Sequence, residues 1–257
     1  MRLHPPRPGP RIASTAGLQP GPSGQRRERH LRRCWRPGRT WLVAAGLGCL
    51  AAVLVLGVVV AHGATPIDQA AYRDLHIVLS QHRLVRGVAG AVAHERGRWH
   101  GSYVTAALPL LLAAILAAGK LGTLRRDRWR MPRGLGLRAW RWLAWSCILL
   151  GSVPLVEALR LAFDRPDPTE SANPRSPLGS YPSGAALLVA LGWIVGGTVI
   201  VRLRPSWRRP LLAAGALALA VHAAARVAVG AHWLTDVLGS YLLAAGMALL
   251  AAAAAAA

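Results

Sequence analysis

Long apolar blocks alternate with polar connections along most of this chain. The blocks are about 16 to 25 residues long and carry no ionised group in their middles, and an α-helix of that length crosses the ~30 Å hydrocarbon core of a bilayer. The pattern therefore predicts an all-α fold, a polytopic membrane bundle of about six transmembrane helices. The predicted spans are Trp41–His62, Tyr103–Gly119, Trp142–Phe163, Pro182–Val201, Pro210–Gly230 and Trp233–Ala257.

The connection after the first block has a pattern of its own. From Pro66 to Ala93, apolar residues such as Ile67, Leu75 and Leu79 recur at helical spacing among charged ones. This periodicity predicts an amphipathic helix that lies at the membrane surface and packs over the bundle. Its simplest role is that of a structural cover.

Basic residues are concentrated in alternate connections. Of the 31 Lys and Arg residues, 22 lie in segments 1–40, 120–141 and 202–209, and only seven lie in 63–102 and 164–181. Cytoplasmic loops carry an excess of Lys and Arg, so both termini are predicted to be cytoplasmic in a multi-pass protein of the cell membrane. The net charge of +21 is then explained by attraction to anionic lipid, and no nucleic-acid partner is expected.

The N-terminal segment differs from the rest. Residues 1–40 are rich in Arg, Pro and Gly and are predicted to be a disordered cytoplasmic tail, followed by a membrane domain over residues 41–257. A signal peptide cleaved near residues 61–64 is the alternative, but the apolar run is longer than a signal core, which favours a retained anchor. The chain has three cysteines, none in a predicted extracytoplasmic loop, so no disulfide framework is expected.

Three polar clusters are predicted to lie at the extracytoplasmic ends of the spans. In one, His232 and Asp236 are four residues apart at the head of a helix and share a face. The carboxylate can hold the imidazole in one tautomer and raise its nucleophilicity. Arg226, at the end of the preceding span, can fold over the same spot and bind a phosphate.

A second cluster opens the fourth predicted span. The sequence Pro182-Ser183-Gly184-Ala185 places a proline in the expected first turn, where free N–H groups point at any bound anion. Taken alone, this stretch is equally compatible with a plain helix cap. Beside Arg226 and His232, an anion site is the better interpretation.

The third cluster ends the third predicted span with Arg160, Arg165-Pro166 and Asp167-Pro168. A basic residue before an Arg-Pro turn, then Pro-Ser-Gly, then Arg-x5-His-x3-Asp resembles the type 2 phosphatidic acid phosphatase superfamily. That superfamily includes membrane lipid phosphatases and vanadium haloperoxidases. The resemblance covers about residues 103–250, the expected phosphatase-like core, and its third motif is the most specific.

The resemblance implies a phosphatase that attacks phosphorus with a histidine and forms a phosphohistidine. The matching catalytic residues are His232 and Asp236. No cofactor or metal is implied. The residues implied to bind the lipid phosphate are Arg226, Arg160, Arg165, Ser183 and Gly184.

The chain departs from the family pattern at the first two motifs. Ala185 stands where the family has a His that protonates the leaving group. The family's first motif is Lys-x6-Arg-Pro. In one register of this chain, Arg160 stands at the Lys position and Asp167 at the Arg position. The other register keeps Arg165-Pro166 in place but puts Ala158 at the Lys position.

Two functions follow. The first is an integral membrane phosphatase that hydrolyses an isoprenyl diphosphate or a phosphatidate-type lipid at the extracytoplasmic face. The alternative is a catalytically impaired homologue that binds lipid phosphate, as the Ala185 and Asp167 departures suggest. A general acid supplies about 10²–10⁴-fold in rate, so its loss favours a diphosphate, whose leaving group is better. His222, four residues before Arg226, is a weaker candidate for a substitute acid.

Overall fold

The computed structural model describes residues 38–93, 106–117, 145, 151–168 and 179–255. From Arg39 onward these residues belong to one compact unit, and the regular elements among them are helices. The all-α prediction is therefore confirmed. Residues 1–37, for which the sequence predicts a disordered tail, lie outside the described residues.

Four of the described segments are long and apolar enough to cross a membrane. Their bounds fall within a few residues of the predicted spans because mean hydropathy over a helix-length window is a strong signal in a chain of this kind. The four helices are α2 (Arg39–Val60), α7 (Gly184–Leu203), α8 (Arg208–Ala228) and α9 (Leu234–Ala254). A 3₁₀ turn, η1 (Pro205–Trp207), joins α7 to α8.

The other two predicted spans are described only in part. Ala106–Ala117 is a shorter apolar helix, and residues 151–163 form the end of the third predicted span. The remainder of both spans lies outside the described residues, so the count of six stays a prediction.

The helices differ in how much of their surface they bury. In their most apolar windows, α7 and α9 are 61% and 50% buried, whereas α2 and the span that contains α8 are each 22% buried. Apolar side chains such as Val55 and Val58 on α2 are more than half exposed. An apolar outer surface suits contact with lipid rather than water, and α7 and α9 therefore form the interior of the bundle.

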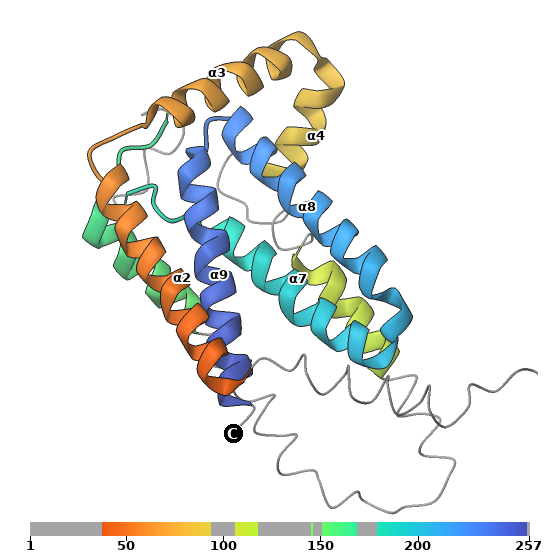
Figure 1. Cartoon of the computed structure of the whole chain (residues 1–257). Helices are drawn as coiled ribbons and strands as arrows, with labels where there is room; N and C mark the ends of the chain where they lie inside the picture. Colours follow the sequence, from red (N-terminus) through yellow and green to blue (C-terminus); the bar gives the residue numbers. More distant parts are fainter. Residues whose placement is uncertain (1–37, 94–105, 118–144, 146–150, 169–178, 256–257) are drawn as a thin grey trace, which may run out of the picture. The chain divides into compact units, whose positions relative to one another are not determined.

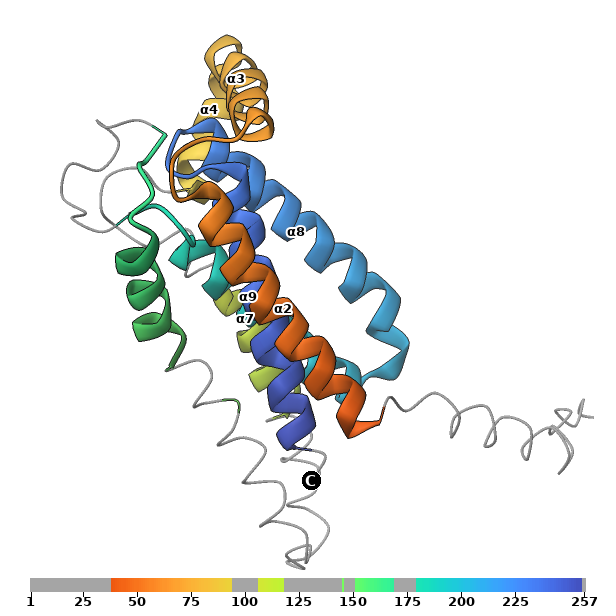
Figure 2. The same cartoon turned by 60° about the vertical axis from the view of Figure 1, so that its left-hand side comes forward.

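Small residues let α2 and α9 lie close together. A Cβ added at Gly46 would lie 2.9 Å from the Leu250 side chain, and one added at Gly246 would lie 3.1 Å from Cys49 Cβ. Close backbone approach at glycines is typical of helix pairs in membranes. Figures 1 and 2 show the two helices side by side, with the start of α2 and the end of α9 at the same end of the bundle.

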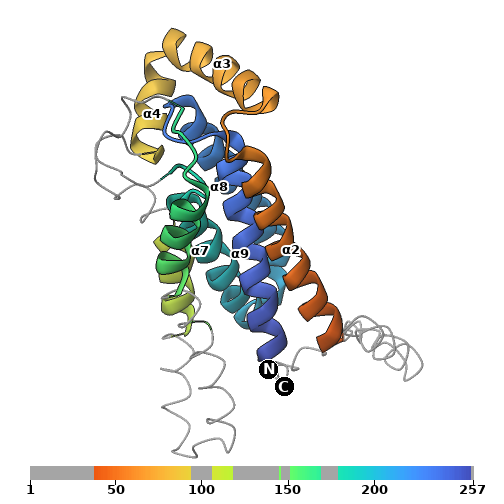
Figure 3. The ribbon, with the colours of Figure 1, turned by 90° about the vertical axis from the view of Figure 1, so that its left-hand side faces the viewer.

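The amphipathic segment at the opposite end consists of two helices rather than one. α3 (Pro66–Gln81) and α4 (Arg83–Ala93) are separated at His82, whose φ of −124° and ψ of 105° are extended. Both helices pack against α8, and Figure 3 shows them over the end of the bundle. The His76 Nδ1 lies 3.1 Å from the Ala228 carbonyl oxygen, which fixes α3 to the end of α8.

Candidate active site

The turn between α8 and α9 sets the distance between Arg226 and His232. Gly230 has a φ of 72°, a conformation in which a Cβ is unfavourable. The Gly230 N–H donates to the Val227 carbonyl at 3.0 Å, and the Ala231 N–H donates to the Arg226 carbonyl at 3.0 Å. These two bonds form a Schellman motif. The five residues between Arg226 and His232 thus contain the C-terminal cap of α8, and His232 precedes the first residue of α9, Leu234, by two positions.

His232 and Asp236 lie together at the head of α9, as their spacing predicted. The His232 Nδ1 is 3.5 Å from the Asp236 Oδ2, longer than an ordinary hydrogen bond, and such bonds tighten when substrate binds. The Trp233 N–H donates to the same Oδ2 at 2.9 Å, which holds the carboxylate. Both side chains are buried, so Asp236 faces the imidazole with little water between them.

The environment keeps His232 uncharged. Burial and the nearby Arg226 lower the pKa of His232 to about 4, although Asp236 opposes the shift. At neutral pH the imidazole therefore carries a free lone pair on one ring nitrogen. That is the form in which a histidine attacks an electrophile.

The head of α7 is tied to the head of α9. Ser183 is the N-cap of α7, and its N–H donates to the Asp236 carbonyl at 3.3 Å. The Ser240 hydroxyl is 2.9 Å from the Ser183 carbonyl and 2.7 Å from the Asp236 carbonyl. α7 begins at Gly184, two residues later than predicted, so Pro182 precedes the helix. The first N–H groups of α7, at Gly184 and Ala185, have no acceptor within the helix.

Arg160 and Asp167 flank this helix head. The Arg160 Nε–H donates to the Pro182 carbonyl at 3.1 Å. Burial, followed by the charge of Asp236, raises the pKa of Asp167, while Arg160 and Arg226 act in the opposite direction. The structure thus places Asp167 within the electrostatic field of both arginines and of Asp236.

Arg165 lies behind the site, fully buried. Its Nη1 donates to Asp236 and, at 2.7 Å, to the Thr235 hydroxyl. Its Nη2 donates to the Asp68 carboxylate at 2.7 Å and to the Gly63 carbonyl at 3.1 Å. Arg165 was expected to bind phosphate, but both of its terminal nitrogens face acceptors of the protein itself.

Sequence reasoning missed three residues of this site. Asp68 and Thr235 share the Arg165 guanidinium, and Trp233 donates its indole N–H to the Pro166 carbonyl at 2.9 Å. The sequence Thr65-Pro-Ile-Asp68 is a capping-box pattern, so Asp68 could have been identified as part of a helix start. Its contact with Arg165 joins segments 97 residues apart and leaves no local signal.

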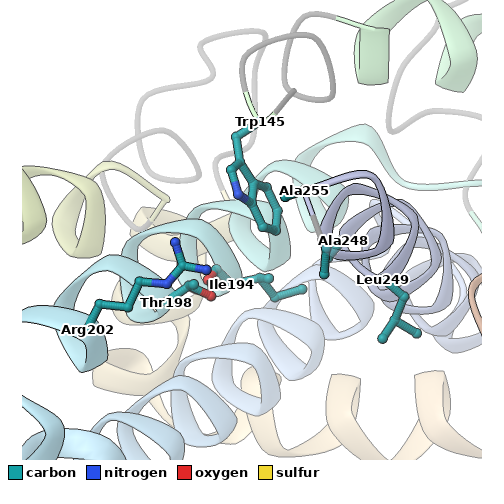
Figure 4. A pocket seen from close by; sticks show the side chains of 8 residues that line it. Trp145, Ile194, Thr198, Arg202, Ala248, Leu249 and Ala255 are labelled. Carbon is teal, nitrogen blue, oxygen red and sulfur yellow. Dashed lines mark hydrogen bonds between the residues drawn. The ribbon is translucent and has the colours of Figure 1, made fainter. Parts of the chain in front are cut away.

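A pocket of about 350 Å³ lies elsewhere. Figure 4 shows its lining, which consists of Trp145, residues of α7 such as Thr198 and Arg202, and residues of the last turns of α9 such as Ala248. Among the described residues, its lining includes no histidine and no carboxylate, and it shares no residue with the site around His232.

Comparisons with known proteins agree with this geometry. Residues 139–256 match the sequence model of the PAP2 superfamily. The fold is similar to the crystal structure of the first transmembrane PAP2 type phosphatidylglycerolphosphate phosphatase from Bacillus subtilis. The TM-score is 0.53 at 19% identity, over 81% of this chain and 94% of that one. No curated protein matches the chain at a significant level. The matched region holds Arg226, His232 and Asp236 in their expected order, and the chain is a multi-pass membrane protein that is similar to the PAP2 superfamily over residues 139–256.

Proposed function

We propose that this protein is a membrane lipid phosphatase that uses His232 as a covalent nucleophile. The observation that carries the proposal is the buried, neutral His232 beside Asp236, one capped turn away from Arg226. A histidine in this state can attack phosphorus, and its orienting carboxylate can stabilise the positive charge that develops on the ring. The distribution of basic residues supports an extracytoplasmic site.

The reaction has two displacement steps. Asp236 beside Nδ1 favours the tautomer with the proton on Nδ1, so the Nε2 lone pair attacks the terminal phosphorus. The bond from that phosphorus to the leaving oxygen breaks, which expels the lipid alkoxide from a monophosphate or the lipid monophosphate from a diphosphate. Arg226, Arg160 and the N–H groups at the head of α7 hold the non-bridging oxygens. A water molecule then attacks the phosphohistidine, the P–N bond breaks, and inorganic phosphate leaves with the imidazole restored.

The residue at position 185 determines which leaving group is tolerated. Ala185 is buried at the first turn of α7 and cannot donate a proton. An alkoxide from a lipid monophosphate needs a proton as it leaves, whereas a diphosphate expels a phosphate monoester, which is a far weaker base. We therefore infer that an isoprenyl diphosphate is a better substrate than phosphatidate or the phosphatidylglycerolphosphate named for the Bacillus subtilis structure.

The test is phosphate release by purified protein from undecaprenyl diphosphate, phosphatidate and phosphatidylglycerolphosphate. His232→Ala should abolish release and any acid-labile phosphoenzyme, because no other group takes over the attack. Asp236→Asn should slow turnover while substrate binding persists. Full activity of His232→Ala would exclude the mechanism.

A lipid-phosphate-binding protein without turnover is the second candidate. It is favoured by Asp167, a carboxylate in the field of Arg160 and Arg226 at a position where one motif register expects an arginine. Under this alternative the wild type retains lipid phosphates in a binding assay, and Arg226→Gln weakens retention, yet no phosphate is released from any of the three lipids.

A further inference from the structure

A carboxylate from outside the matched region reaches the catalytic pair. Asp68 lies in the first turn of α3, well before residues 139–256. Its side chain is completely buried. An isolated buried carboxylate is strongly unfavourable, so its partners must compensate for the lost hydration.

Those partners fall into two groups. Locally, Asp68 forms a capping box with Thr65: the Thr65 N–H donates to Asp68 Oδ2 at 3.0 Å and the Asp68 N–H donates to the Thr65 hydroxyl at 3.3 Å. At long range, the Thr235 N–H donates to Asp68 Oδ1 at 2.9 Å, and Arg165 donates to Oδ2 at 2.7 Å. Burial alone would raise the pKa of Asp68, but these hydrogen bonds outweigh it and lower the pKa, so the group is ionised.

Arg165 connects this carboxylate to the catalytic one. One terminal nitrogen pairs with Asp68 and the other with Asp236, so a single guanidinium fork spans both. Asp236 offers Oδ1 to Arg165 and Oδ2 to the His232 side of the site. The four side chains form a continuous series, Asp68–Arg165–Asp236–His232.

The charges in this series explain why a second carboxylate is needed. If Arg165 faced Asp236 alone, its positive charge would offset the negative charge that supports the His232 ring during phosphoryl transfer. Asp68 balances Arg165 from the opposite side, and the three groups together keep one net negative charge next to the imidazole. In a buried site such charges interact strongly because little water screens them.

We propose that Asp68 is a positioning residue for the phosphoryl-transfer reaction, acting on His232 through Arg165 and Asp236. The inference rests on the proposed function and deepens it by assigning α3 a part in the chemistry. Arg165 is then a bridge between two carboxylates rather than a ligand of the substrate phosphate.

A simpler role, as a tether that only fixes α3, predicts different behaviour. Thr65→Ala removes the cap of α3 but leaves the Asp68–Arg165 pair, so it should lower thermal stability and change kcat less than about twofold. Asp74→Asn, at an exposed position of the same helix, removes the same charge outside the series and should change neither quantity. Asp68→Asn should lower kcat about 10- to 100-fold, the range typical of residues that orient a ligand from behind, with little change in KM.

The decisive measurement is the behaviour of the imidazole. Without Asp68, the positive charge of Arg165 is less balanced, so the acid limb of the kcat/KM profile should move to lower pH. The loss caused by Asp68→Asn should also nearly vanish in an Asp236→Asn background, because residues that act through one another are not additive. Arg165→Lys keeps a buried cation but lacks the fork that spans both carboxylates, and it should reproduce the kcat loss if Asp68→Asn does not fold.

The fate of this inference can be separated from that of the proposed function. Nitrogen NMR of histidine-labelled protein reports the His232 ring without substrate, and Asp68→Asn or Arg165→Lys should shift those signals while Asp74→Asn does not. Absence of any phosphate release by the wild type would overturn the proposed function alone. A folded Asp68→Asn or Arg165→Lys protein with wild-type ring signals, and with wild-type kcat where turnover exists, would overturn the role of Asp68.

Discussion

At the scale of single residues, the proposed chemistry depends on an imidazole that is neutral although an ionised network surrounds it. Opposing influences act on the pKa of His232: burial and Arg226 disfavour the protonated ring, and Asp236 favours it. Burial and Arg226 prevail, so the resting imidazole is neutral and can act as a nucleophile. In the proposed mechanism, the positive charge appears only during phosphoryl transfer, when Asp236 can stabilise it.

The pH dependence follows from this balance. Because the pKa of His232 is lowered to about 4, the ring stays neutral as the pH falls below the ordinary histidine value of about 6.5. We expect kcat/KM for a diphosphate substrate, corrected for the ionisation of the substrate, to fall only as the pH approaches about 4. A corrected acid limb near the ordinary value would contradict the description of the site as buried and desolvated.

Restoring a proton donor at position 185 should change the substrate preference. In Ala185→His, an imidazole at the head of α7 can protonate the departing oxygen, and a general acid helps most where that oxygen is most basic. We expect turnover of a lipid monophosphate to rise about 10-fold or more and that of a prenyl diphosphate to rise less. Ala185→Gln, of similar size but unable to titrate, is the matched control. Equal gains on both substrates would contradict the leaving-group argument.

At the scale of elements, the capped end of α8 determines how Arg226 meets His232. The positive φ of Gly230 lets the chain reverse within the two hydrogen bonds of the cap. A side chain such as that of Ala would be strained in this conformation.

Gly230→Ala should therefore destabilise the protein by about 1 kcal/mol, measured as a lower midpoint of thermal unfolding in detergent. Gly197→Ala is the matched control, since an added Cβ there meets nothing within 4 Å and improves helix propensity. If both variants unfold at the same temperature as the wild type, the turn is not under the constraint described.

Which elements the sequence predicted depends on how local their causes are. Spans α2, α7, α8 and α9 were predicted because an apolar stretch in a bilayer must satisfy its backbone within itself. The His232–Asp236 pair was predicted because helical spacing alone brings the two together. The break at His82 and the approach of Asp68 to Arg165 were not predicted, since both depend on how α3 and α4 pack on the rest of the bundle.

At the scale of the whole molecule, α2 is an integral part of the bundle. Its Val53 carbonyl accepts a hydrogen bond from the buried Tyr181 hydroxyl at 2.7 Å, and Tyr181 packs edge-on against Phe163 at 5.5 Å between ring centroids. Gly46 and Gly246 seat α2 against α9. These contacts support retention of the first helix as an anchor rather than its removal as a signal.

Reporters fused before Met1 and after Ala257 should therefore both read as cytoplasmic and should both remain on the full-length protein. The reasons are the charge distribution, 22 of 31 basic residues in alternate connections, and the position of the start of α2 and the end of α9 at one end of the bundle. An N-terminal reporter released from the membrane fraction would contradict retention. An extracytoplasmic C-terminal reporter would contradict the topology.

The buried pairing of Asp68 with Arg165 also limits how this molecule can be recombined. The three family motifs all lie between residues 139 and 256, yet the carboxylate that neutralises Arg165 comes from α3. A chimera that joins this region to a foreign first half without an equivalent of Asp68 would leave a guanidinium buried beside a single acid, and breaking such a pair costs about 3–5 kcal/mol. We therefore expect that α3 and residues 139–256 have to be exchanged together.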